Sequence, residues 1–154
     1  MNAGCEAVFA QDLGSLVDGV LLVASHNYDA KSIRNNKDFA NVGEQYEAVN
    51  KEIMPEQGVS AFNAVFLVAQ ALEKTASTDK EKLRDAIRAL TITSLTPGGP
   101  LKFNADGWSE NGLAVMIQWQ KGTDGVYRPR SVFPPEEADV DFQLTDMLKT
   151  KIKK

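Results

Sequence analysis

Apolar and polar positions alternate along the first half of the chain in ways that predict one strand and one amphipathic helix. The run Gly19–Ala24 is continuously apolar and rich in aliphatic side chains, which predicts a strand buried on both faces, as in a parallel sheet beneath helices. Apolar residues then recur at steps of three and four across residues 39–53, and this spacing predicts an amphipathic helix. We expect Pro55 and Gly58 to end that helix.

Two further helices are expected before residue 91. The segment 61–72 is apolar nearly all round, which predicts a helix that begins after Ser60 as its N-cap and is buried between layers, with its aromatic rings in the core. Thr78 and Glu81 have the spacing of a capping box and predict that a third helix begins at Thr78.

The chain changes from helical to extended patterns after Leu90, where two prolines and adjacent glycines within residues 91–100 predict a tight loop. The extended elements expected beyond it are a strand over 101–103, a turn over 104–107, a strand over 113–120, and a hairpin turn over 121–125 that leads into residues 126–133. The side chains expected to share one face of the second strand are Leu113, Val115, Ile117 and Trp119. After Pro134 and Pro135 we expect a solvated terminal helix or a frayed tail.

Composition narrows the classes of function. The chain has 154 residues, 43% hydrophobic and 25% charged, which suffices for one core but not for two full domains. With 17 Lys and Arg against 21 Asp and Glu, the formal net charge is −4, so we expect no nucleic-acid partner. The longest apolar runs are far shorter than the roughly 18 residues of a membrane span, and the N-terminus does not have the pattern of a signal peptide.

No group of residues has the spacing of a catalytic or metal site. With one cysteine, Cys5, and one histidine, His26, a site of several Cys and His ligands is excluded, and we expect no metal, no cofactor and no enzymatic activity. The glycine cluster at 97–100 matches neither phosphate-binding fingerprint. The polar segment Ser25–Asp29 directly follows the first predicted strand, where ligand crevices lie in open α/β sheets, with an ordinary surface loop as the alternative.

Six phrases stand in a fixed order along the chain: Leu16–Val23, the helix around Phe39–Met54, Ser60–Lys74, Asp79–Leu90, Gly99–Gly107 and Val115–Gly122. In this order they resemble the carboxyl-terminal portion of the type I periplasmic binding proteins, the branched-chain amino-acid (Leu/Ile/Val) type of ABC-transporter substrate-binding protein. The resemblance covers roughly residues 9–134.

The resemblance implies an α/β fold class: a fragment of the periplasmic-binding-protein type I fold, with three main helices, a mixed sheet and a C-terminal β-hairpin. It implies four parts in order: the end of one lobe with a hinge-crossing strand at 1–24, a helical α/β portion of the other lobe at 25–112, a returning β-hairpin at 113–135 and a C-terminal tail at 136–154.

The function implied is the solute-binding component, or a truncated remnant of one, of an ABC transporter for branched-chain amino acids or related small organic acids. Such a protein catalyses nothing and captures its ligand by hinge closure. Its partners would be that small molecule and the ABC permease. The ligand contacts implied are His26, Asn27 and Tyr28 after the crossing strand and Phe62 at the start of the buried helix, with packing in the core as the alternative for Phe62.

A structural half-receptor that forms a homodimer and binds no ligand alone is the alternative function, because missing elements would leave apolar helix and sheet surface exposed. The resemblance implies a periplasmic location. Without a signal peptide in this chain, the product would be cytoplasmic if the gene is truncated.

Overall fold

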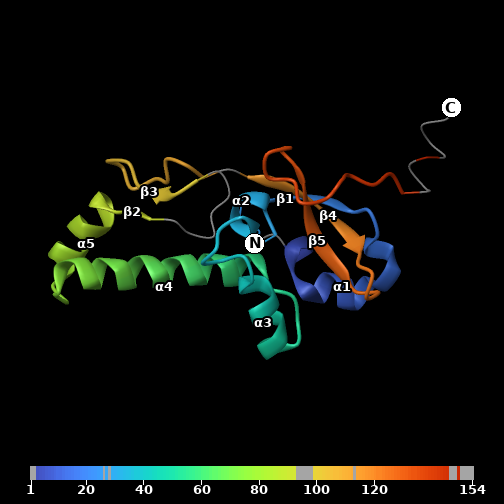
Figure 1. Cartoon of the computed structure of the whole chain (residues 1–154), viewed down its shortest axis with the longest axis horizontal. Coiled ribbons are helices and arrows are strands. Elements are labelled where there is room, and N and C mark those ends of the chain that lie inside the picture. The colour runs from blue at the N-terminus through green and yellow to red at the C-terminus, as the bar shows by residue number, and fades with distance from the viewer. Residues whose placement is uncertain are drawn as a thin grey trace.

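A long helix separates two groups of strands in the computed structural model of the chain (Figure 1), which describes residues 3–25, 27, 29–92, 99–112, 114–145 and 149. The elements in chain order are η1 (Ala3–Cys5), α1 (Ala7–Leu13), η2 (Gly14–Val17), β1 (Leu21–Ala24), α2 (Lys31–Arg34), α3 (Val42–Asn50), α4 (Glu56–Thr75), α5 (Lys80–Ala89), β2 (Thr91–Ile92), β3 (Leu101–Lys102), β4 (Val115–Lys121) and β5 (Tyr127–Phe133). At one end of α4 lie α5 and the β2–β3 pair, and at the other lie α1 and the sheet β1–β4–β5.

The three-stranded sheet is antiparallel at both of its pairings. Leu22 pairs with Ile117 in the β1–β4 ladder, and Ile117 pairs with Ser131 in the β4–β5 ladder. The two strands of the predicted hairpin are therefore confirmed, but the predicted mixed sheet is wrong for the strands that the structure describes. A short turn reverses the chain between β4 and β5, and such a connection can join only antiparallel neighbours.

One face of this sheet, the inner face, is the apolar one that the alternation predicts. Val115, Ile117 and Trp119 are at most 1% exposed. Trp119 forms one apolar cluster with Phe9 of α1 and Val17 of η2, and Val115 and Ile117 form another with Cys5 of η1. The Trp119 ring lies 6.0 Å from that of Phe9, and its Nε1 donates to the Gly4 carbonyl at 2.7 Å. Leu113 lies outside the described residues.

The opposite face, the outer face, is covered only in part. Gln118 is fully buried because Gln143 pairs with it through both its backbone N–H and its carbonyl, at 2.9 and 2.8 Å. Residues 136–145 therefore fold back onto the sheet and are not the expected frayed tail. They supply the hydrogen-bond partners that the side-chain amide of Gln118 needs in order to be buried. Leu21 and Val23 of β1 are 39% and 60% exposed, so the expectation of a strand buried on both faces is wrong.

A second core joins the segment after β1 to α3 and the start of α4. Its buried members are Ala30, Ile33, Phe39, Met54 and Val59. The half-buried rings of Phe62 and Phe66 stand edge-on to the Phe39 ring, with centroids 5.7 and 5.5 Å away. The prediction that the rings of this helix lie in the core is confirmed to that extent.

The helix α4 begins earlier than predicted and is not buried all round. Its N-cap is Pro55, which has the extended backbone usual for an N-cap, while Ser60 lies inside and donates to the Glu56 carbonyl. Gly58 is therefore helical rather than a terminator. Val65 and Val68 are 72% and 44% exposed, so one side of α4 faces solvent in the described part of the chain.

The N-cap of α5 is Asp79 and not Thr78. The Asp79 Oδ1 accepts from the backbone N–H groups of Glu81 and Lys82 at 3.1 and 3.0 Å. Asp is as good a cap as Thr, and its charge is also favourable at the positive end of the helix dipole. The turn predicted at 104–107 is confirmed by the Asn104 Oδ1, which accepts from the backbone N–H groups of Asp106 and of Trp108, the residue after the turn. No helix among the described residues has the length and apolarity needed to cross a membrane.

Candidate functional site

The segment after β1 folds inward and is held to β5. Asn27 and Asp29 are 5% and 1% exposed. The Asn27 Nδ2 donates to the Ser131 Oγ at 2.9 Å and its Oδ1 accepts from the Asp29 backbone N–H at 3.2 Å. His26 and Tyr28, two of the predicted ligand contacts, lie outside the described residues. The amide of Asn27 thus fixes the position of the neighbouring carboxylate.

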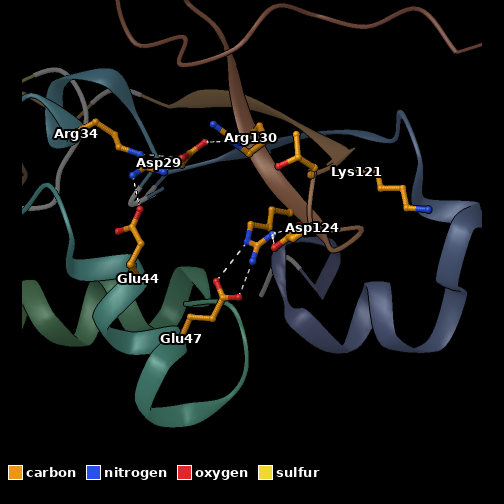
Figure 2. A pocket seen from close by; sticks show the side chains of 11 residues that line it. Asp29, Arg34, Glu44, Glu47, Lys121, Asp124 and Arg130 are labelled. Carbon is orange, nitrogen blue, oxygen red and sulfur yellow. Dashed lines mark hydrogen bonds and ion pairs between the residues drawn. The ribbon is translucent and has the colours of Figure 1, made fainter.

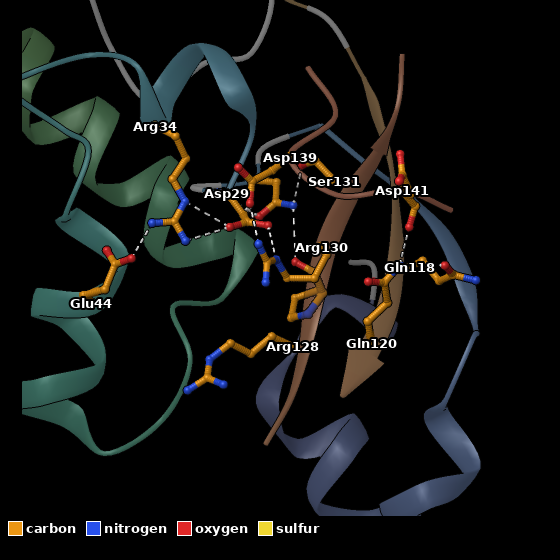
Figure 3. A network of polar contacts seen from close by, with 12 residues as sticks. Asp29, Arg34, Glu44, Gln118, Gln120, Arg128, Arg130, Ser131, Asp139 and Asp141 are labelled. Carbon is orange, nitrogen blue, oxygen red and sulfur yellow. Dashed lines mark hydrogen bonds and ion pairs between the residues drawn. The ribbon is translucent and has the colours of Figure 1, made fainter. Parts of the chain in front are cut away.

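Asp29 is the centre of a buried ion network (Figure 3). Its Oδ1 accepts from Arg34 Nε and Nη2 at 3.1 and 3.0 Å, and its Oδ2 accepts from Arg130 Nε at 2.6 Å. Arg34 also pairs with Glu44 on α3, and Arg130 pairs with Asp139. We call these five residues the Asp29 network. It ties α2, α3, β5 and the C-terminal segment to one carboxylate.

Burial and the neighbouring positive charges shift the pKa of the Asp29 carboxylate in opposite directions. Burial raises the pKa of Asp29, and the guanidiniums of Arg130 and Arg34 oppose that shift without cancelling it. For Arg34 and Arg130, burial works to lower the pKa, but the carboxylates beside them raise it above the usual value. The unfavourable free energy of burying the network therefore arises mainly from the desolvation of the Asp29 carboxylate, while both arginines remain charged.

A cavity of about 450 Å³ opens between α3 and the β4–β5 hairpin, beside the Asp29 network (Figure 2). We call it the charged pocket. Its ionisable lining side chains are Asp29, Arg34, Glu44, Glu47, Lys121, Asp124, Arg128 and Arg130. Arg128 lies between two carboxylates: its Nη2 reaches Glu47 at 2.6 Å and its Nη1 reaches Asp124 at 2.9 Å. Both signs of charge therefore line the walls, an arrangement that suits a small ligand with complementary charges.

Neither Asn27 nor Phe62 lines the charged pocket. Phe62 stacks on Phe66 with ring planes 14° apart, and Asn27 uses its amide on β5. Both remain predicted ligand contacts.

Sequence reasoning did not single out Arg34, Arg128 or Arg130. The alternation of arginines at 128 and 130 in a predicted strand is the signal that could have found two of them, because such residues share one side of the strand.

Two further observations concern possible metal ligands and the cysteine thiol. No group of His, Cys, Asp and Glu among them has the arrangement of a metal site. Cys5 is 3% exposed, and burial, with Glu56 nearby, raises the pKa of its thiol to about 12. A thiol with so little thiolate is a poor nucleophile.

No protein-family model matches the chain, and no curated protein matches it. Solved structures do share its fold. An ABC transporter substrate-binding protein from Sphaerobacter thermophilus aligns with a TM-score of 0.62 and 18% identity, over 90% of this chain and 37% of its own. The leucine-binding protein LivK from Thermotoga maritima aligns with a TM-score of 0.59 and 17% identity, over 84% and 35%.

A third similar structure is the solute-binding protein of an ABC transporter from R. palustris in complex with benzoate, with a TM-score of 0.60 and 19% identity, over 85% of this chain and 33% of its own. The chain thus has the fold of part of a type I periplasmic binding protein, and it spans 33–37% of the length of these structures.

Proposed function

We propose that the chain is part of a solute-binding receptor of an ABC transporter, which captures a branched-chain amino acid or a related small organic acid. The observation that carries the proposal is the shared fold, which extends over 84–90% of the chain in these three solute-binding proteins. One of them is named as a leucine-binding protein and another holds benzoate. Both ligands are small carboxylates with an apolar body.

The division of the chain supports capture by closure rather than catalysis. We assign residues 1–24, 113–135 and the tail 136–154 to one lobe and its crossings, and residues 25–112 to the other lobe. The charged pocket has walls from both parts, because α3 supplies Glu44 and Glu47 while the β4–β5 hairpin supplies Lys121 and Arg128. A ligand that contacts both walls favours the closed form over the open one. The permease and a periplasmic location belong to the same proposal.

The charged pocket is the binding site that we propose for the acidic group of the ligand. Arg128 is 22% exposed and shares its guanidinium between Glu47 and Asp124. A ligand carboxylate can replace one of these partners, because the pair with Asp124, itself half exposed, is the weaker of the two. An ammonium group on the same ligand would then find Glu47 or Glu44 across the pocket. His26, Asn27, Tyr28 and Phe62 stay proposed ligand contacts, of which Asn27 and Phe62 lie outside the lining of the charged pocket.

Isothermal titration of the chain with leucine, benzoate and isoamylamine tests this proposal. We expect leucine or benzoate to bind, isoamylamine not to bind, and Arg128→Gln to weaken binding by about tenfold, which corresponds to about 1.4 kcal/mol. Arg84→Gln is the matched control, because Arg84 also pairs with two carboxylates but lies on α5. Absence of binding by all three compounds at about 1 mM, or equal losses in the two variants, would overturn it.

A second function, a half-receptor that pairs with another copy of itself, is favoured by one observation on the outer face of the sheet. Val23 is opposite Met116, and Met116 is opposite Phe133. These three side chains are 60%, 37% and 55% exposed, and form an apolar row across all three strands. Sedimentation velocity tests it: we expect a dimer that Phe133→Ser dissociates, and a monomer at high concentration would exclude it.

A further inference from the structure

α5 and β3 lie at the end of α4 that is far from the β4–β5 hairpin (Figure 1), and an apolar groove is formed there. It has a volume of about 440 Å³ and is formed by α5 and the turn after β3. Its floor consists of Leu83, Ile87 and Phe103, which are all half-buried. We call it the α5 groove. No part of the chain that the structure describes fills it, and the proposed binding of solute does not use it.

The rim of the α5 groove is basic along one side. Lys80, Arg84 and Arg88 line it at steps of four residues, so they stand on one face of the helix above the apolar floor. Arg84 is neutralised by Glu81 and Asp85. Lys80 and Arg88 have no ion pair with any described residue and are exposed. Two unneutralised cations about 12 Å apart, from the helical rise, therefore flank the groove.

We propose that the α5 groove binds an acidic amphipathic segment of a partner protein. Charge complementarity carries the choice: the chain has a formal net charge of −4, yet this rim presents cations beside an apolar floor. A partner helix with apolar residues at steps of three and four, and carboxylates two turns apart along one edge, would match the floor and both cations at once. The basic groups would mainly set orientation and association rate, and the apolar floor would supply affinity.

The fluorescence of Trp108 can report directly on binding in the α5 groove. It follows Gly107, a lining residue, and is 75% exposed, whereas the other tryptophan, Trp119, is 0% exposed. Quenching of tryptophan fluorescence by acrylamide therefore reports mainly on Trp108. A segment bound in the α5 groove should reduce that quenching, because it shields the indole from solvent.

The probe is a fluorescein-labelled amphipathic peptide with leucines at helical spacing and glutamates along one edge, titrated into the whole chain and followed by anisotropy. An unlabelled copy serves for the acrylamide measurement. We expect saturable binding, less quenching of Trp108, and a loss of at least about tenfold in affinity for the double variant Lys80→Glu with Arg88→Glu. Lys82→Glu is the matched control for each of the two substitutions: it makes the same charge reversal on α5 but does not line the groove, and we expect less than a twofold effect.

Several outcomes would overturn the proposal. They are no saturation of the anisotropy at about 1 mM chain, equal binding of a peptide whose glutamates are replaced by lysines, or equal losses in the double variant and in Lys82→Glu. Vesicles of phosphatidylglycerol form a parallel arm. Vesicle binding that needs Lys80 and Arg88, without peptide binding, would assign the basic rim to an anionic membrane instead. Circular dichroism of each variant confirms that the chain remains folded.

Discussion

Two neighbouring strands are held in place by different physical interactions. The inner side chains of β4, such as Ile117 and Trp119, are at most 1% exposed and pack against apolar groups of η1, α1 and η2. In contrast, β5 is held through Arg128 and Arg130, which pair with carboxylates from three other segments. Apolar burial is non-directional and stabilises in proportion to area, whereas a buried ion pair contributes little net stability but requires each partner in its place. The apolar packing of β4 therefore stabilises the fold, and the ion pairs of β5 position the segments around it.

The largest expected effect comes from breaking the inner face. Trp119→Ala removes a fully buried indole and should lower the free energy of unfolding by about 3–5 kcal/mol. Urea denaturation followed by circular dichroism measures it. Trp108→Ala is the control on an exposed indole and should change the free energy by less than about 0.5 kcal/mol. Similar losses in the two variants would show that the inner face is not the main core.

A smaller effect is expected when the Asp29 network is broken. Asp29→Asn preserves the shape of the side chain but leaves Arg34 and Arg130, 30% and 25% exposed, facing a neutral amide. We expect a loss of about 2 kcal/mol, because the amide nitrogen of Asn is a donor and cannot accept from Arg130 Nε as Asp29 Oδ2 does, while two guanidiniums remain partly desolvated. Thermal unfolding and urea titration both measure it.

Glu44→Gln is the control for that variant, since Glu44 belongs to the same network but its side chain is 51% exposed. An exposed ion pair contributes less than about 1 kcal/mol, so this variant should remain close to the wild type. If Glu44→Gln cost as much as Asp29→Asn, burial of the central carboxylate would not be what distinguishes the two positions.

The sequence predicts the inner face well because its signal is local. Val115, Ile117 and Trp119 recur at every second position, and a period of two is sufficient to assign them to one side of a strand. The resemblance of ordered phrases likewise predicted the fold, which the solved structures share. Helix starts were less predictable: Thr78 and Asp79 are adjacent and are both good caps, so residue type alone does not select between them.

The Asp29 network could not be predicted, because its partners are distant in the sequence. Asp29 and Arg130 are 101 residues apart, and neither residue type nor spacing indicates which carboxylate meets which guanidinium. The packing of residues 136–145 on the sheet could not be predicted for the same reason. Nothing in the residue types or spacing of Gln118 and Gln143 indicates that they form hydrogen bonds with each other in the folded chain. Positions 26 and 28, which carry two of the predicted ligand contacts, lie outside the described residues.

The smallest expected effect is the pH dependence that Asp29 adds to stability, and its sign is the sharpest test of how the network works. Burial raises the pKa of Asp29 above the ordinary 3.8 despite its two arginines. The folded state then holds a proton that the unfolded state has released, so this stabilising contribution is complete below pH 3.8 and is lost as the pH rises through the folded pKa.

Urea titrations of wild type and Asp29→Asn across that range isolate this contribution, because the two proteins differ only in whether residue 29 carries a carboxyl group. The free-energy advantage of the wild type should shrink as the pH rises. If the advantage grew with pH instead, attraction by Arg34 and Arg130 would outweigh the desolvation of Asp29. The network would then stabilise the fold as well as position its parts, and the contrast between β4 and β5 would be one of degree.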